Sequence, residues 1–243
     1  MIPKKIHYCW FGKNPLPEQT KQYIETWKKY CPDYEIIEWN EDNFDVNQNL
    51  YCKEAYEAKK WAFVSDYVRL KVLYDNGGIY MDTDIEVIKS LDNLLQYNWF
   101  SGFEAENKIQ TGVIGAEIRN DFIKLLLEDY KKREFTNSKN KYDLTTNVHV
   151  LTKKIKKIYR VQLNNTYQIF GNNYLLLPFD YLCCKDYLSG KIHKTKNSYT
   201  IHHFEGSWLD NYGRVKIIAQ RLLCFVFGNK NIVLLKKILK NGK

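Results

Sequence analysis

Two acidic residues separated by one position, Asp82 and Asp84, follow the short apolar run Ile79–Met81. The glycine pair Gly77 and Gly78 precedes this run and predicts a turn into a strand. Residues i and i+2 of a strand point to the same face, so both carboxylates are expected to converge on one cation. Hard oxygen ligands suit Mn²⁺ or Mg²⁺, which in turn hold diphosphates. A D-x-D sequence in a loop is more often a solvated turn, and its position at the end of a parallel strand is what favours a ligand site.

A second feature is a pair of opposite charges, Asp66 and Arg69, upstream of the two aspartates. Residues three apart share one face of a helix, and the apolar spacing over 52–74 predicts a helix here. A surface ion pair is the alternative interpretation. Apolar residues surround the pair in the stretch 62–70, which argues against an open surface position. A partly buried acid and base at fixed spacing offer the acceptor and the donor that a polyhydroxy ligand needs.

The third feature is a histidine, His202, in the predicted strand 199–203. A histidine in a strand is most often structural, but one followed by a polar loop can supply an imidazole to the same metal. Trp10, at the end of the predicted strand 5–11, fits either the core or a stacking position at the ligand edge of the sheet. His7 in the same strand is predicted to be a core histidine.

An α/β fold is expected to position these side chains. Strand 5–11, helix 18–30 and strand 34–39 follow one another, and a strand-helix-strand unit predicts a parallel sheet. We therefore expect an α/β sandwich around a central, mostly parallel sheet. The further elements are expected at 79–81, 99–103 and 111–116 as strands, and at 52–74, 120–132 and 146–157 as helices.

The composition is that of a folded chain, because 44% of the 243 residues are hydrophobic and 27% are charged. Six cysteines are scattered without C-x-x-C spacing, so we expect buried free thiols and neither a zinc knuckle nor a disulfide framework. The sequence has no apolar signal segment and no apolar run long enough to cross a bilayer. This pattern predicts a cytoplasmic protein.

The net charge of +9 predicts an anionic partner, and most of it lies in one segment. Residues 209–243 carry a net charge of +7 together with long apolar side chains, the pattern of two basic amphipathic helices. We expect this tail to hold the protein peripherally on the inner face of the cell membrane, an anionic surface. Packing of the tail on the preceding domain is the equal alternative. Confinement of the charge to an apolar tail argues against a nucleic-acid partner.

Four ordered blocks of this sequence resemble the pattern of glycosyltransferase family 32, the family with a DXD sugar-binding region. They are the segments 6–12, 61–69, 77–84 and 202–208. The first three blocks are also similar to the catalytic domains of the large glucosylating bacterial toxins. The resemblance covers residues 2–208. It implies a GT-A fold, a nucleotide-sugar donor, a divalent metal, and transfer with retention of anomeric configuration.

The resemblance also implies roles for the residues described above. Asp66 and Arg69 would bind hydroxyl groups of the donor sugar. Asp82 would contact the sugar or the ribose and share the metal site, whereas Asp84 would ligate the metal directly. His202 matches the histidine position that recurs in the family and would supply the imidazole ligand.

Further positions follow from the same blocks. Trp10 would stack on the base of the donor, and Ser207 and Trp208 would reach the diphosphate as a closing loop. In an extended strand, His203 would point to the face opposite the preceding histidine. The chain departs from the family at 145–147, where many members carry a Gly-Pro pair, so the handling of the acceptor near these residues does not follow from the family.

Together these observations predict a metal-dependent, retaining glycosyltransferase with a catalytic domain at 1–208 and a basic tail at 209–243. The donor would be a nucleotide sugar of the UDP type, and the acceptor a glycan or a lipid-linked glycan in surface polysaccharide synthesis. A metal-dependent phosphatase or phosphotransferase that uses the D-x-D site is one alternative, and a non-catalytic sugar-binding module is another. Two more blocks, 103–104 and 111–116, fit the family pattern without a firm role.

Overall fold

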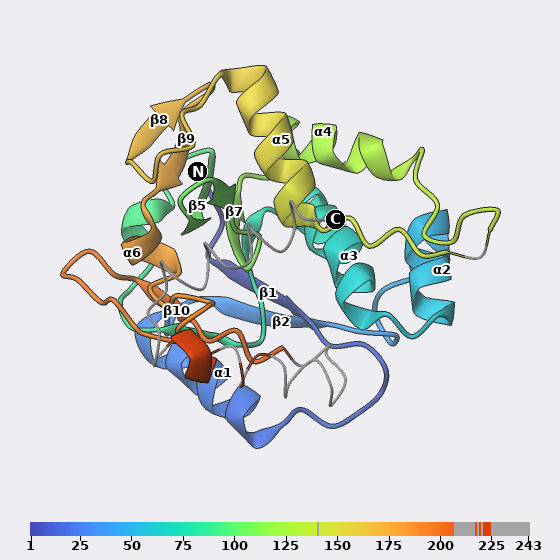
Figure 1. Cartoon of the computed structure of the whole chain (residues 1–243), viewed down its shortest axis with the longest axis horizontal. Helices are drawn as coiled ribbons and strands as arrows, with labels where there is room; N and C mark the ends of the chain where they lie inside the picture. Colours follow the sequence, from blue (N-terminus) through green and yellow to red (C-terminus); the bar gives the residue numbers. More distant parts are fainter. Residues whose placement is uncertain (140, 207–216, 218, 220, 225–243) are drawn as a thin grey trace.

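The computed structural model describes residues 1–139, 141–206, 217, 219 and 221–224. A central sheet crosses the molecule, and helices lie on both sides of it (Figure 1). From one edge to the other, the strands of this sheet are β2 (Glu35–Trp39), β1 (Lys5–Cys9), β3 (Gly78–Met81), β7 (Val113–Ala116), β5 (Trp99–Ala105), β9 (Tyr174–Leu177) and β8 (Gln168–Phe170). A short strand, β6 (Lys108–Ile109), pairs with β5 off this path.

The strands run mostly parallel. β1 is parallel to both β2 and β3, and β9 is parallel to β5. β7 is antiparallel to β3 on one side and to β5 on the other, so β3 and β5 point the same way. Within the described part of the chain, β6, β7 and β8 alone run against the other strands of this sheet. The predicted α/β fold, with a central, mostly parallel sheet flanked by helices, is confirmed.

The helices divide between the two faces of the sheet. α1 packs on one face, where Trp27 lies in an apolar cluster with Ile6 and Ile79 of the strands. α3 packs on the other face with α2, α4 and α5, and there Val68 and Tyr80 belong to a second cluster. Ile79 and Tyr80 are neighbours in β3, so the alternation of one strand supplies both cores. The helices are α1 (Glu18–Tyr30), α2 (Leu50–Glu57), α3 (Trp61–Asn76), α4 (Asp121–Tyr130), α5 (Asn147–Tyr159) and α6 (Phe179–Leu182), with short 3₁₀ turns η1 (Val46–Gln48) and η2 (Asp92–Leu94).

The prediction of the first helix, 18–30, is confirmed, but the single helix predicted over 52–74 is wrong because the chain forms α2 and α3 there. The break lies at Lys59, whose φ of 55° is left-handed. The N–H of Lys60 then donates back to the backbone oxygen of Ala55 over 2.9 Å, a pattern that ends helices. No glycine marks this stop in the sequence, which explains the error.

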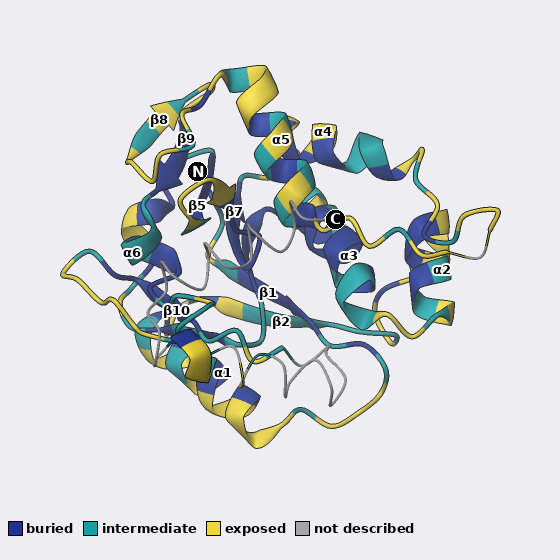
Figure 2. Ribbon diagram, in the orientation of Figure 1, coloured by how far each residue is buried: buried dark blue, intermediate teal, exposed yellow. Residues whose placement is uncertain are grey.

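A second, two-stranded sheet lies on the α1 side. β4 (Ile85–Val87) pairs antiparallel with β10 (Thr200–His202), and His202 stands opposite Ile85. The indole of Trp27 in α1 donates to the backbone oxygen of Ile85 over 2.7 Å and fixes this sheet on the helix. The predicted strand near 199–203 is thereby confirmed. Both strands are largely buried, as are β3 and much of α3 (Figure 2).

Of the tail 209–243, the structure describes residues 217, 219 and 221–224, all of them helical. Cys224 is buried, whereas Leu222 is exposed. The rest of the two predicted tail helices lies outside the described residues. All six cysteines are buried free thiols, as predicted. Among the described residues, no helix combines the length and the apolar character needed to cross a membrane.

Candidate active site

The two aspartates of the D-x-D sequence are positioned by β3 and the turn before it. Gly77 closes the last turn of α3 with its N–H, and Gly78 follows with a φ of +104°. A Cβ on Gly78 would lie 2.8 Å from the backbone oxygen of Lys5, so only glycine fits between the strands. β3 then delivers Asp82 and Asp84 to the carboxyl edge of the parallel strands, where α/β folds bind their ligands.

Arg69 joins two of the predicted carboxylates. Its Nη2 lies 3.2 Å from Asp66 Oδ1, and its Nη1 lies 3.2 Å from Asp82 Oδ1. Nη1 also donates to the backbone oxygen of Thr111 over 2.7 Å, and the guanidinium lies 4.5 Å from the centre of the Tyr80 ring. Asp66 is 8% exposed and Arg69 is 5% exposed, so the alternative of an open surface pair is wrong.

Burial dominates the electrostatics of this pair. It raises the pKa of Asp66 to about 6, although the charge of Arg69 and the N–H of Asn147 act in the opposite direction. Burial acts most strongly against the charged form of Arg69, but its acidic neighbours, with Asp82 first among them, together outweigh burial and raise the pKa of Arg69 above its ordinary value. At neutral pH, Asp66 is therefore an ionised carboxylate in a poorly solvated place. Such a group is a strong acceptor for hydroxyl donors.

Asp84 pairs with His202 between the ends of the two sheets. His202 Nε2 lies 3.3 Å from Asp84 Oδ1, and the N–H of Glu205 donates to Asp84 Oδ2 over 2.9 Å. Burial acts to raise the pKa of Asp84, but His202 and these hydrogen bonds lower it overall. Burial likewise acts to lower the pKa of His202, and Asp84 raises it overall. Each group therefore stabilises the charged form of the other.

Three side chains at this edge fit a divalent cation. Asp82, Asp84 and His202 each offer one ligand atom, and these atoms lie within 4.8 Å of one another. Within the part of the chain that the structure describes, no group forms a hydrogen bond with the buried His202 Nδ1, so it is a polar atom that a ligand would satisfy. Gly112 keeps the space open, because a Cβ there would lie 3.0 Å from both Asp82 Oδ2 and His202 Cε1. Two carboxylates and one imidazole form a donor set that suits Mn²⁺, so the residues fit the predicted metal.

The two candidates of the first strand have different positions. Trp10 follows β1, the neighbour of β3, so it stands at the same edge of the sheet as the aspartates. It is half-buried, its indole donates to the backbone oxygen of Asn14 over 2.6 Å, and its stacking role stays a prediction. His7 is fully buried and is a core histidine, as predicted. Its Nε2 donates to the backbone oxygen of Gly77 over 2.8 Å, and its Nδ1 accepts the indole N–H of Trp39 over 3.1 Å.

The adjacent histidines point in different directions. His203 Nε2 lies 2.8 Å from Glu86 Oε2, outside the cluster that contains His202. The two rings therefore have different partners, and His203 follows the last residue of β10. Ser207 and Trp208, predicted to close over the diphosphate, lie outside the described residues.

Sequence reasoning missed three contributors to this arrangement. Thr111 holds Arg69 through its backbone oxygen, and Gly112 leaves room beside the cation ligands. Asn147 donates its backbone N–H to Asp66 Oδ2 over 3.3 Å. The block 111–116 and the departure at 145–147 were signals that these segments matter. Neither segment could be given a role from the sequence. Two of the contributions come from backbone groups, and the third comes from the absence of a side chain at Gly112.

Comparison with known proteins agrees with this geometry. A family model described as a glycosyltransferase sugar-binding region containing a DXD motif matches residues 17–101. The chain is 25% identical over 235 residues to inositol phosphoceramide mannosyltransferase 2 of Schizosaccharomyces pombe, and the match covers 93% of this chain and 64% of that protein. The chain spans less than two thirds of the length of the first curated relatives it matches.

Two solved structures are less similar in sequence to this chain than the mannosyltransferase is. The PaToxG glycosyltransferase matches with a TM-score of 0.47 and 19% identity over 64% of this chain and 69% of that one. The galactosyltransferase LgtC, solved with donor and acceptor sugar analogues, matches with a TM-score of 0.45 and 10% identity over 89% of this chain and 95% of that one. The matched family segment contains Asp66, Arg69, Asp82 and Asp84. Residues 17–101 therefore match the model of glycosyltransferase sugar-binding regions with a DXD motif, the family that the sequence blocks resemble.

Proposed function

We propose that the chain is a metal-dependent, retaining glycosyltransferase with its catalytic domain at 1–208. It transfers a sugar from a nucleotide sugar of the UDP type to a glycan or a lipid-linked glycan. The observation that carries this proposal is the meeting of three metal-ligand side chains beside the buried pair of Asp66 and Arg69. A cation site and a hydroxyl-binding carboxylate at one sheet edge match the diphosphate and the sugar of such a donor.

Asp82, Asp84 and His202 would hold Mn²⁺ or Mg²⁺, with Asp84 as the direct ligand. When bound, the ion supplies Lewis acidity that offsets the negative charge on the leaving diphosphate. The role of the protein is to hold these three side chains in position. Arg69 Nη1 and the hydroxyl of Tyr80 both contact Asp82 Oδ1, at 3.2 and 3.0 Å, so this carboxylate is oriented without the ion.

Asp66 would accept hydrogen bonds from hydroxyl groups of the donor sugar. Among the described residues, Arg69 contacts one oxygen of Asp66 and Asn147 contacts the other, and a carboxylate oxygen accepts two hydrogen bonds. Arg69 Nη1 is already bonded to Thr111. We therefore assign Arg69 mainly the role of holding Asp66 and Asp82 at a fixed separation, where it stabilises both charges.

Three aromatic and hydroxyl side chains complete the proposed site for the sugar donor. Trp10 would stack on the base, since it stands at the same sheet edge. Ser207 and Trp208 would reach the diphosphate and exclude water, because hydrolysis of the activated donor competes with transfer.

Retention of configuration is proposed from the family resemblance. Asp66 and Asp82 are both held by Arg69, and we assign neither of them the role of a covalent nucleophile. A route on one face of the sugar, in which the acceptor enters on the side from which the diphosphate leaves, is the form of reaction that we propose.

The test is a panel of nucleotide sugars, each assayed for metal-dependent release of nucleoside diphosphate, with the anomeric configuration of the product determined by NMR. We expect release from at least one UDP-sugar with Mn²⁺ or Mg²⁺ and none in excess chelator. Release of inorganic phosphate from phosphoesters would instead support the phosphatase or phosphotransferase alternative. Binding of sugars without turnover would support the non-catalytic module.

We propose in addition that the acceptor lies at a membrane, in surface polysaccharide synthesis, with the enzyme peripheral on the inner face. The support is the sequence of residues 209–243, with their net charge of +7, and the name of the similar Schizosaccharomyces pombe protein, an inositol phosphoceramide mannosyltransferase. Co-sedimentation with anionic and neutral vesicles, at low and high salt, tests this on the full chain and on a chain ending at Asn229. Equal, negligible binding of both chains to anionic vesicles would overturn it.

A further inference from the structure

Asn147 holds Asp66 at two points. It is the first residue of α5, and its backbone N–H donates to Asp66 Oδ2 over 3.3 Å. Its side-chain Nδ2 donates to the backbone oxygen of Asp66 over 2.5 Å. Asn147 is 3% exposed, so water does not compete freely for these bonds. The carboxylate and the main chain of Asp66 are therefore both fixed from α5.

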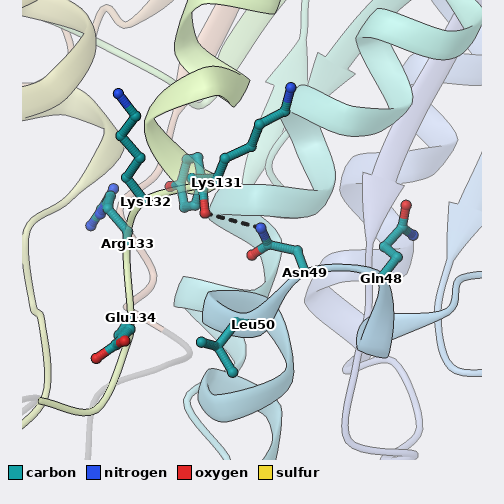
Figure 3. A pocket seen from close by; sticks show the side chains of 8 residues that line it. Gln48, Asn49, Leu50, Lys131, Lys132, Arg133 and Glu134 are labelled. Carbon is teal, nitrogen blue, oxygen red and sulfur yellow. Dashed lines mark hydrogen bonds between the residues drawn. The ribbon is translucent and has the colours of Figure 1, made fainter.

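Tyr130, the last residue of α4, holds Asn147 in turn. Its hydroxyl donates to Asn147 Oδ1 over 2.6 Å, and both side chains are buried. The backbone oxygen of Tyr130 accepts a bond of 3.0 Å from the side chain of Asn49, which also caps α2 (Figure 3). Tyr130 is therefore fixed both at its main chain and at its hydroxyl.

Arg133 is the third residue that stabilises the position of Asn147, after Asp66 and Tyr130. Its guanidinium carbon lies 4.7 Å from the centre of the Tyr130 ring and 4.6 Å from that of Tyr51. Its Nε and Nη2 donate to Asp143 Oδ2 over 3.0 and 2.8 Å, and Nη2 donates to the backbone oxygen of Thr145 over 3.0 Å. Arg133 also lines a cavity of about 490 Å³ between η1, the start of α2 and the chain that leaves α4 (Figure 3). The segment that leads into α5 is thus anchored before it reaches the site.

We propose that Asn147 is a positioning residue for Asp66, and that Tyr130 and Arg133 keep it in place. The segment 133–147 would then set the direction in which the Asp66 carboxylate faces the donor sugar. A displacement of about 1 Å in a reacting geometry can cost about 100-fold in rate, so this support matters for turnover. The proposal rests on the proposed function, because it assigns the sugar contact to Asp66.

The backbone donor at position 147 depends on the residue type, because proline has no N–H to donate. Asparagine at position 147 therefore adds a donor to Asp66 that a proline at this position cannot supply. Substitution of Asn147 by proline therefore tests the contribution of the backbone donor.

Asn147→Pro removes the backbone donor and the side-chain amide together, at a position where the backbone accommodates proline. Position 147 is the first of α5, where proline is favoured, and Thr146 before it has φ −74° and ψ 154°, which suit a residue before proline. Asn147→Ala is the complementary variant, since it keeps the N–H and removes the amide. We expect each variant to lower kcat about tenfold or more, with KM for the donor and the affinity for free nucleoside diphosphate changed by less than about threefold.

Tyr130→Phe removes only the hydroxyl that holds Asn147. It should lower kcat as Asn147→Ala does, and the double variant should be little worse than either single one, because the two residues act through one bond. Tyr34→Phe is the matched control. Tyr34 is also buried and donates its hydroxyl to a carboxylate, that of Asp92, over 3.0 Å. Tyr34 does not contact Asn147, Tyr130 or Arg133, so kcat of the Tyr34→Phe variant should be unchanged.

The outcomes separate the two proposals. A wild-type chain that releases no nucleoside diphosphate from any nucleotide sugar overturns the proposed function and this inference with it. Wild-type turnover with unchanged kcat in Asn147→Ala and Tyr130→Phe overturns the positioning role alone. A lower melting temperature with unchanged kcat per folded molecule likewise shows a structural role and overturns it. A lower kcat with preserved diphosphate affinity, in these variants and not in Tyr34→Phe, supports it.

Discussion

The guanidinium of Arg69 donates to the backbone oxygen of Thr111 over 2.7 Å. This bond ties α3 to the loop before β7, and the next residue of that loop, Gly112, faces Asp82 and His202. The N–H of Asp82 in turn donates to the backbone oxygen of Gly112 over 2.8 Å. The loop that contains Thr111 and Gly112 therefore connects the proposed hydroxyl-binding residues with the proposed cation ligands. Substitutions within it are expected to show which side each residue serves.

Asp84→Ala is expected to abolish metal-dependent turnover. The variant loses the proposed direct cation ligand and the partner that raises the pKa of His202. Loss of such a group costs about 100-fold or more in rate, so turnover should fall by at least that factor while the melting temperature changes little. Turnover is measured against Mn²⁺ concentration.

The control for this prediction is Asp75→Asn. Asp75 is exposed near the end of α3, and its carboxylate pairs with Lys71 outside the proposed site, so turnover of the Asp75→Asn variant should equal that of the wild type. Full wild-type turnover in excess chelator would contradict the metal requirement. Retained turnover in Asp84→Ala would contradict the assignment of the ligand.

Gly112→Ala is expected to weaken cation binding while the chain stays folded. The added Cβ would stand 3.0 Å from Asp82 Oδ2 and 3.0 Å from His202 Cε1, so both side chains would have to shift by a few tenths of an ångström. We expect the Mn²⁺ concentration for half-maximal turnover to rise about tenfold. Direct titration of Mn²⁺ by electron paramagnetic resonance measures the same change without turnover.

Gly115→Ala provides the contrast three residues later. There the Cβ would stand 2.0 Å from the ring of Phe100, which is fully buried. Such overpacking costs about 1–3 kcal/mol of the free energy of unfolding or more, so the melting temperature should fall. Normal Mn²⁺ affinity in Gly112→Ala would show that the glycine is not required by the cation site.

The sequence predicted the parts of this site that carry chemistry in their side chains. Asp82 and Asp84 were found because they follow a predicted strand, at the edge of the sheet where α/β folds bind their ligands. Asp66 and Arg69 were found because two opposite charges lay among apolar helix residues. His202 was found by its strand and by family resemblance, and the structure brings it to the same cluster.

Other parts could not be predicted, because they depend on backbone groups and long-range packing. Thr111 contributes a carbonyl oxygen, which every residue has, and Asn147 contributes an N–H. The end of α2 depends on a left-handed Lys59, a conformation that is uncommon for residues other than glycine. Such features have no signature in the residue type.

Asp66→Asn is expected to impair transfer more than binding of the nucleotide. The substitution removes the charge that we assign to the donor sugar, while Arg69 keeps its contacts with Asp82 and Thr111. We expect turnover to fall about 100-fold or more and the affinity for free nucleoside diphosphate with Mn²⁺ to change by less than about threefold. Both are measured on the same preparation, by product release and by calorimetry. An equal loss of diphosphate affinity would show that Asp66 is structural or serves the nucleotide.

His7 is expected to make the fold sensitive to mild acid. Burial lowers its pKa to about 4, although the carbonyl of Gly77 acts to raise it. Both nitrogens of the neutral His7 ring form hydrogen bonds. Nε2 donates to the backbone oxygen of Gly77, and Nδ1 accepts the indole N–H of Trp39. A second ring proton would point at that N–H.

The sign of the effect follows from these pKa values. The unfolded chain binds a proton at His7 below pH about 6.5 and the folded chain only near pH 4, so stability is complete above 6.5 and falls as the pH drops. The loss amounts to about 3 kcal/mol in the free energy of unfolding. Asp66, with its pKa raised by burial to about 6, acts in the opposite direction over the same range, so His7 must be isolated by substitution. Urea unfolding from pH 7 to pH 4 should show a steeper decline for the wild type than for His7→Gln, and NMR should place the midpoint of the His7 ring near 4. Equal slopes, with a ring that titrates near 6.5, would show that the imidazole is not held in its neutral form.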